Sequence, residues 1–185
     1  MLSAWMIAAT TAWALPPVPP PLAVSAEEAA QLRDGQLVFR EEASGLNIAI
    51  LDVVSSPDAV MHAVMDLAPR VEDIGSLLSF EAYNDGPGRK SARWELGASV
   101  YSATFHVLYA YDHAKGWCVY TLDTSKENDI SSVDGSYQVY LVEGGSRLVY
   151  RSQQQNNILP GWMMKKFARG GAEELLRGIA ARAAG

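Results

Sequence analysis

The fold is decided by the stretch Val100-Tyr101-Ser102-Ala103-Thr104-Phe105-His106-Val107-Leu108-Tyr109-Ala110-Tyr111. Apolar and aromatic residues such as Phe105 and Tyr109 occupy every second position, and small or polar residues such as His106 lie between them. Successive side chains of a β-strand point to opposite faces of a sheet, so this period of two predicts a long strand with one covered and one solvated face. Sheets of this kind are typically antiparallel.

Shorter strands are expected on both sides of this one. Each is an alternating or β-branched run bounded by a turn, such as Ala43-Ser44-Gly45, Asn84-Asp85-Gly86-Pro87-Gly88 or Glu143-Gly144-Gly145. The expected strands cover residues 37–41, 46–51, 78–82, 91–96, 116–124, 135–142 and 146–154. Together they predict an N-terminal strand pair and, later in the chain, an antiparallel meander.

Helices are expected between the strand pair and the meander, and again at the end of the chain. Ser56 is a typical N-cap, and Pro57 fits the first position of a helix that Pro69 ends. Residues 71–77 are expected to form a second, short helix. A long terminal helix begins at Pro160, with an apolar face of Trp162, Met163, Phe167, Leu175 and Ile179. This order of elements predicts the α+β class.

Composition restricts the class of protein. The chain has 185 residues, 49% of them hydrophobic, which is enough for one domain with a substantial core. Its net charge of −6 argues against nucleic-acid binding, which needs a basic surface. A single cysteine, Cys118, excludes an intrachain disulfide framework and any metal site built on several cysteines.

The N-terminal segment has the composition of an export signal. No charged side chain precedes Glu27, and the apolar run of residues 1–14 ends in Ala12-Trp13-Ala14, which resembles a signal-peptidase site. Fourteen residues are too few to span a hydrocarbon core of about 30 Å as a helix. We therefore expect a signal peptide and a periplasmic or secreted protein. An uncleaved anchor and a cytosolic arm are the alternatives, because the segment lacks the usual Lys or Arg.

The rest of the chain divides into two parts. Residues 15–35 are expected to form a proline-rich polyproline II spacer and a short helix with Ser25 as its N-cap, and residues 36–185 the folded domain. The spacer is expected to hold this domain away from the export machinery or a membrane.

Several short motifs occur in an order that resembles a known family. They are Trp94-Glu95-Leu96-Gly97, Phe105-His106-Val107-Leu108-Tyr109, Tyr120-Thr121-Leu122-Asp123, Glu127-Asn128-Asp129-Ile130, Glu143-Gly144-Gly145-Ser146-Arg147-Leu148 and Leu159-Pro160-Gly161-Trp162. From about residue 38 to residue 181 the sequence is similar to polyketide cyclase/START-like proteins of the SRPBCC superfamily, of a bacterial exported type. The resemblance implies a helix-grip (START-like, Bet v 1-like) fold, in which a curved antiparallel sheet wraps a long C-terminal helix. It also implies an elongated apolar cavity between the two.

If the sheet curls around the last helix, the apolar face of each strand becomes the cavity wall. The residues expected to bind a ligand there are Trp94, Tyr101, Phe105, Tyr109, Tyr120, Tyr137, Tyr150, Met163 and Phe167. Tyrosine and tryptophan combine an apolar body with one hydrogen-bonding tip, and methionine adapts to irregular ligands. The alternative is that these side chains pack against one another as an ordinary core.

Two features of the last helix have open interpretations. Gly170-Gly171 lies in mid-helix, where each glycine lowers the stability of the helix by about 1 kcal/mol relative to alanine. The pair either makes room for a ligand, permits a hinge or allows a close approach to the sheet. Lys165, Lys166 and Arg169 form a basic turn that either contacts anionic lipid headgroups or is simply solvated.

Catalytic and metal-binding patterns are weak. His62, His106 and His113 are far apart in sequence, no known nucleophile or phosphate-binding motif occurs, and we expect neither a metal nor another cofactor. The polar loop that contains Asp123, Glu127, Asn128 and Asp129 either closes one end of the cavity, holds a cation or is an ordinary turn.

The sequence therefore predicts an exported binding or carrier protein for a hydrophobic small molecule such as a lipid, quinone or isoprenoid. A small cyclase or dehydratase acting on an apolar polyketide-like substrate is the first alternative, and the sequence favours the binding protein over the enzyme. An accessory protein that docks on another exported protein, with an interior filled by side chains, is the second.

Overall fold

The computed structural model describes residues 15–98, 101–155 and 161–185, with the side chains of all of these except residues 98, 101 and 161–167. The elements in chain order are α1 (Ala26–Arg33), β1 (Val38–Glu41), β2 (Asn47–Val53), α2 (Pro57–Met65), α3 (Arg70–Asp73), β3 (Leu77–Gly86), β4 (Arg89–Ala98), β5 (Tyr101–Asp112), β6 (Trp117–Leu122), β7 (Ser132–Val142), β8 (Gly145–Gln155) and α4 (Gly161–Ala184).

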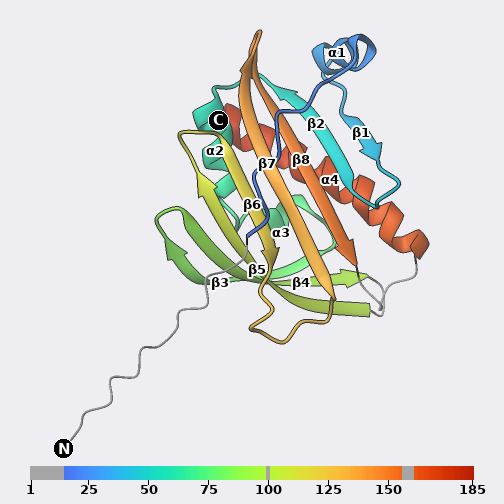
Figure 1. Ribbon diagram of the computed structural model, residues 1–185, viewed down its shortest axis with the longest axis vertical. Helices are drawn as coiled ribbons and strands as arrows, with labels where there is room; N and C mark the ends of the chain where they lie inside the picture. Colours follow the sequence, from blue (N-terminus) through green and yellow to red (C-terminus); the bar gives the residue numbers. More distant parts are fainter. Residues whose placement is uncertain (1–14, 99–100, 156–160) are drawn as a thin grey trace, which may run out of the picture.

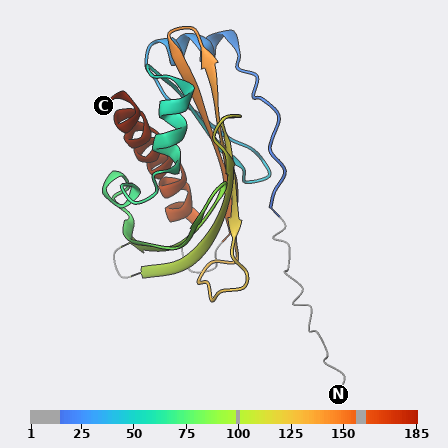
Figure 2. The same ribbon diagram turned by 90° about the vertical axis from the view of Figure 1, so that its left-hand side faces the viewer.

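The strands form one antiparallel sheet in the order β1-β2-β8-β7-β6-β5-β4-β3 (Figure 1). Strands β3 to β8 are a meander, and β2 joins it by pairing with β8, from Asn47 opposite Ser152 to Val53 opposite Ser146. The sheet curves, and α2, α3 and α4 lie against one of its faces (Figure 2). The predicted α+β class and helix-grip arrangement are therefore confirmed.

The main core lies between the sheet and the helices. On α2, Val60, Met61 and Val64 are fully buried, and Leu176 and Ile179 of α4 face the same cluster. The apolar positions of α2 recur every three or four residues, so burying that face against the sheet and α4 stabilises the helix. As predicted, Ser56 is the N-cap of α2, and Pro57 is its first residue.

The strand boundaries differ most from the prediction at the turn between β3 and β4. Asn84 and Asp85 were expected in a turn, but β3 runs on to Gly86, and only Pro87 and Gly88 connect it to β4. Gly88 has φ +72°, a conformation that glycine adopts without strain. A proline–glycine pair is therefore sufficient for the turn, and the polar residues before it extend the strand.

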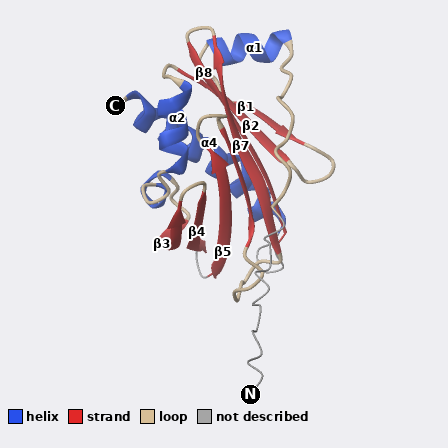
Figure 3. Cartoon of the chain, turned by 60° about the vertical axis from the view of Figure 1, so that its left-hand side comes forward, coloured by secondary structure: helices blue, strands red, loops and turns tan. Residues whose placement is uncertain are grey.

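The proline-rich segment lies along the outer face of the sheet (Figure 3). Gln138 Nε2 donates to the Pro19 carbonyl at 2.6 Å, and Arg151 Nη2 donates to the Pro20 carbonyl at 3.3 Å. Leu22 packs against a second, smaller apolar cluster on that face. Within the expected spacer, residues 19–22 therefore lie against the sheet, where the Pro19 and Pro20 carbonyl groups and the Leu22 side chain have partners. Among the described residues, no helix is both long and apolar enough to cross a membrane.

Helix α1 covers the end of the same outer face. It has the predicted N-cap, since the Ser25 hydroxyl accepts from Glu28 N at 3.2 Å and Ser25 N donates to the Glu28 carboxylate at 2.7 Å. The Glu28 carboxylate also accepts two hydrogen bonds from Arg40 of β1, at 2.7 and 2.6 Å. These contacts fix the N-terminal segment to the sheet.

Candidate functional site

A cavity of about 370 Å³ lies between the concave face of the sheet and helices α3 and α4. Its wall is formed by side chains from β1, β2, β4 to β8, α3 and α4, together with the start of β3. Ligand pockets for small molecules have volumes of about 300–1,000 Å³. The interior of the protein is therefore hollow, which argues against an accessory protein whose interior is filled by its own side chains.

The structure brings six of the nine predicted residues together in the cavity wall: Trp94, Phe105, Tyr109, Tyr120, Tyr137 and Tyr150. They form three cross-strand pairs, with Trp94 opposite Phe105, Tyr109 opposite Tyr120, and Tyr137 opposite Tyr150. The alternation that was visible in the sequence produces this arrangement, because residues two apart on a strand share a face. The other three, Tyr101, Met163 and Phe167, have side chains outside the described residues.

The aromatic residues also contact one another, so they serve as both core and cavity wall. The Tyr137 and Tyr150 ring centroids lie 5.0 Å apart, and those of Tyr120 and Tyr137 lie 5.8 Å apart. The Tyr120 hydroxyl donates to the Arg151 carbonyl at 3.2 Å. Binding of a ligand by these six residues stays a prediction.

Arg70 is the site residue that sequence reasoning missed. It is the first residue of α3, it lines the cavity, and it is only 4% exposed. Its Nη2 donates to the Val64 carbonyl at 2.6 Å, whereas its Nε is buried with no hydrogen-bond partner among the described residues. No sequence pattern singles it out: α3 ends at Asp73, so no helical period links Arg70 to the other residues of the cavity wall.

Two tyrosine rings flank the Arg70 guanidinium. Its central carbon lies 5.1 Å from the Tyr137 ring centroid and 6.0 Å from that of Tyr109, within range of cation–π attraction. Burial raises the pKa of Tyr109 to about 12 and that of Tyr137 well above its usual value, although the charge of Arg70 opposes both shifts. Both phenols are therefore neutral near pH 7 and supply Arg70 with no counter-charge.

The lone cysteine is close to the same charge and is not reactive. Cys118 is fully buried, and burial raises the pKa of its thiol to about 12, with Arg70 opposing the shift. A thiol in this state is protonated near pH 7 and is a poor nucleophile.

The polar loop before β7 has the structure of an ordinary turn. Asn128 Oδ1 accepts from His106 N at 2.7 Å, and Asp129 Oδ2 accepts from Thr104 N at 2.7 Å. Asp123 accepts from the Tyr83 hydroxyl at 2.8 Å and from the Ser125 hydroxyl at 2.5 Å. The loop side chains thus accept hydrogen bonds from backbone N–H groups in the part of β5 that extends beyond β6. None of these side chains lines the cavity.

The structure distinguishes the adjacent glycines Gly170 and Gly171 of α4. Gly171 lines the cavity, and a Cβ added there would meet only Ile74 Cγ2, at 4.0 Å; one added at Gly170 would meet nothing within 4 Å. A close approach of helix and sheet backbones therefore does not explain the pair, whereas space for a ligand fits Gly171. In the basic turn, Arg169 is exposed with its guanidinium 5.8 Å from the Phe39 ring centroid, and the side chains of Lys165 and Lys166 lie outside the described residues.

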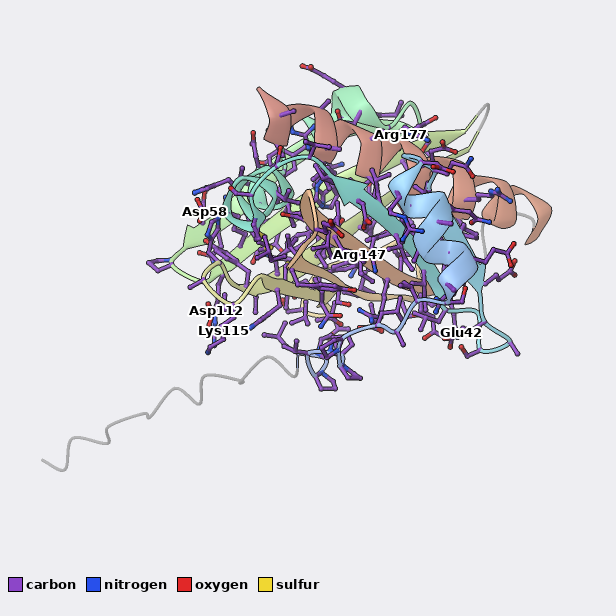
Figure 4. The ribbon with its side chains drawn as sticks, turned by 90° about the horizontal axis from the view of Figure 1, so that it is seen from above. Glu42, Asp58, Asp112, Lys115, Arg147 and Arg177 are labelled. Atoms are coloured by element: carbon purple, nitrogen blue, oxygen red, sulfur yellow. The ribbon has the colours of Figure 1, made fainter. Side chains whose placement is uncertain are left out.

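Two of the scattered histidines meet at the surface. His62 and His113 have ring centroids 4.1 Å apart, and Asp58 lies 3.7 Å from His62 Nε2 and 3.2 Å from His113 Nδ1. The two histidines are far apart in sequence but meet in the fold, because α2 faces the turn after β5. The three could each offer one ligand atom to a metal ion, but Asp58 and His62 are largely exposed, and none of the three lines the cavity. Asp58 lies at the edge of the molecule in Figure 4.

Comparison with known proteins identifies the fold. No protein-family model and no curated protein sequence matches the chain. A protein of solved structure from Thermus thermophilus matches with a TM-score of 0.64 at 18% identity, over 74% of this chain and 94% of that one. The Zhui aromatase/cyclase from a Streptomyces species matches with a TM-score of 0.64 at 12% identity, over 79% of this chain and 94% of that one.

A STAR-related lipid transfer protein fragment from Xanthomonas axonopodis is similar to the same degree. Its TM-score is 0.63 at 10% identity, and the alignment covers 80% of this chain and 99% of that one. The chain therefore has the helix-grip fold of polyketide cyclase/START-like proteins, as the sequence resemblance implied.

Proposed function

We propose that this protein binds a hydrophobic small molecule, such as a lipid, quinone or isoprenoid, in the cavity between the sheet and α4 and carries it outside the cytoplasm. The observation that supports this most strongly is the cavity of about 370 Å³ with seven aromatic residues in its wall, six of them predicted from the sequence. Removing an apolar molecule from water contributes about 25 cal/mol for each Å² that is buried. An aromatic wall of this kind therefore favours apolar ligands.

The side chains around Arg70 favour a carrier over an enzyme. A general acid or base works best with a pKa near the operating pH. Arginine stays protonated at any physiological pH, and the pKa of Tyr109 is raised to about 12. A cyclase acting on a polyketide-like substrate is the alternative, and the similarity in fold to an aromatase/cyclase supports it.

Export is the second part of the proposal, and the sequence of residues 1–14 supports it. A buried, protonated Cys118 is compatible with an oxidising compartment. Exchange of the ligand with a membrane would use the basic turn of Lys165, Lys166 and Arg169. Export is tested by fractionating cells that make the full chain and by determining the N-terminus of the mature protein, which we expect at residue 15 in the periplasmic or secreted fraction.

Native mass spectrometry tests the binding function. The protein is purified without detergent from the cell envelope or medium of its own organism, and an organic extract of the same sample is analysed in parallel. We expect a 1:1 complex with an apolar molecule that appears in the extract. Recovery of bare polypeptide that also binds no added apolar probe contradicts the proposal.

A further inference from the structure

Arg70 carries a positive charge that the described protein does not neutralise. Arginine cannot lose its proton in a protein, so the charge is permanent. Among the described residues, no carboxylate forms an ion pair with it. A buried charge without a partner is costly, and proteins normally pair such charges or neutralise them.

The contacts that Arg70 does make leave it able to bind an anion. One carbonyl, that of Val64, accepts from Nη2, and the rings of Tyr109 and Tyr137 offer cation–π attraction without any counter-charge. The Nε–H, which is buried, has no acceptor among the described residues. Because the guanidinium is planar and carries five N–H donors, it matches the two oxygens of a carboxylate.

A second donor lies beside this charge. Tyr109 Oη accepts a hydrogen bond from Trp94 Nε1 at 3.0 Å, so its own hydrogen remains available to an acceptor. Its pKa, raised to about 12, keeps that hydrogen in place at neutral pH. The polar groups around Arg70 thus offer donors, while most of the remaining wall is apolar.

We propose that the ligand is an amphipathic carboxylic acid, with its apolar body against the aromatic wall and its carboxylate on Arg70, supported by the Tyr109 hydroxyl. This inference rests on the proposed function and adds the charge of the ligand to it. A phosphate headgroup fits less well, because it carries more charge and more acceptor oxygens than one guanidinium and one phenol satisfy.

Probes with the same apolar body and either a carboxylate or a neutral hydroxymethyl end test this inference. Binding to the delipidated full chain is measured by isothermal titration calorimetry for two pairs: dodecanoate with dodecanol, and 2-naphthoate with 2-naphthalenemethanol. The aliphatic and aromatic pairs distinguish a fatty acid from an aromatic acid. A hydrogen-bonded charge pair should favour the acid of at least one pair by about tenfold or more.

Arg70→Met keeps the length and apolar stem of the side chain but removes the charge. The variant should bind the preferred acid about tenfold more weakly and the matching alcohol within about threefold of the wild type. Arg177→Met is the control, because Arg177 is exposed on α4 and does not line the cavity (Figure 4). If Arg70→Met does not fold, Arg70→Lys keeps the charge but not the planar fork, and should reduce the preference for the acid without abolishing it.

The possible outcomes separate the two proposals. If none of the four probes binds the wild type, the proposed function fails, and this inference fails with it. If the wild type binds acid and alcohol equally, or if Arg70→Met retains the preference for the acid, the inference is overturned while the hydrophobic binding function stands.

A thermal scan of the ligand-free Arg70→Met variant adds an independent readout. Its melting temperature should not fall, since the change removes an unpaired buried charge.

Discussion

Trp94 Nε1 donates a hydrogen bond to Tyr109 Oη at 3.0 Å, between neighbouring strands β4 and β5. Both side chains are buried and both line the cavity. Buried polar tips need partners, and here the Tyr109 oxygen accepts the indole N–H of Trp94. The O–H of Tyr109 remains available to an acceptor in the cavity. The pair therefore both connects two strands of the sheet and forms part of the cavity wall.

Trp94→Phe should lower the free energy of unfolding by about 1–3 kcal/mol, because it removes the donor to Tyr109 and shrinks a buried ring. Tyr109→Phe should also destabilise the protein, and the double variant should cost less than the sum of the two, since the second change removes a group that the first leaves unpaired. Urea unfolding of the four proteins measures the coupling. Strict additivity would show that the hydrogen bond does not contribute to stability.

Gly171→Leu should fill the cavity from the side of α4. A side chain there extends past Ile74 into the space that the ligand is proposed to occupy, so the affinity for an apolar probe should fall by about tenfold or more. Gly170→Leu is the matched control on the adjacent exposed position, where affinity should not change. Fluorescence titration with an apolar dye measures both. Equal affinities for the two variants would place the binding site elsewhere.

Gly178→Ala should be less stable than Gly170→Ala. Alanine is favoured over glycine within a helix by about 1 kcal/mol, so Gly170→Ala, which meets no atom, should stabilise α4. At Gly178, a Cβ would lie 2.2 Å from the Asp73 side chain, which receives a hydrogen bond from Arg182. Displacing Asp73 should leave Gly178→Ala about 1–3 kcal/mol less stable than Gly170→Ala in thermal or urea unfolding. Equal stabilisation by both would contradict this packing of α3 on α4.

Acid should release the N-terminal segment through Glu28. Hydrogen bonds from Arg40, and then from Ser25 N, lower the pKa of its carboxyl from 4.5 to about 2. A group whose pKa is lower in the folded state stabilises the protein above its unfolded pKa. That stabilisation should therefore be complete above about pH 4.5 and lost as the pH falls towards 2.

The melting temperature of Glu28→Gln, measured against pH, should fall less steeply than that of the wild type between pH 4.5 and pH 2. Glu27→Gln, one residue earlier in the same helix, is the control, and its curve should parallel that of the wild type. Parallel curves for all three proteins would mean that the contact between Glu28 and Arg40 does not stabilise the fold.

Local patterns were sufficient for most elements and for one face of the cavity, although the short helix expected over residues 71–77 spans only Arg70–Asp73 and Leu77 begins β3. Alternation along a strand depends only on backbone geometry, so Phe105 and Tyr109 were placed correctly on the covered side. The N-caps Ser25 and Ser56 were also predicted, because capping is local chemistry. The helix-grip arrangement followed from the order of these elements together with the family resemblance.

The features that were missed depend on contacts between distant segments. Nothing in the sequence distinguishes Arg70 from an exposed arginine. Its burial under the sheet and its lack of a counter-charge are visible only in the folded structure. His62 and His113 meet because α2 packs beside the turn after β5, a contact that no sequence period encodes. The segment around Pro19 docks on Gln138 for the same kind of reason.

The central claim, that an apolar ligand occupies the cavity, is tested most directly by photo-crosslinking. A dodecanoate analogue with a diazirine on its chain is irradiated with the protein, and the labelled peptides are identified by mass spectrometry. We predict labels on peptides that contain Trp94, Phe105, Tyr120 or Tyr137, competed by excess unlabelled dodecanoate. Labels confined to exposed apolar residues such as Val54, Leu78 and Leu141 would contradict it.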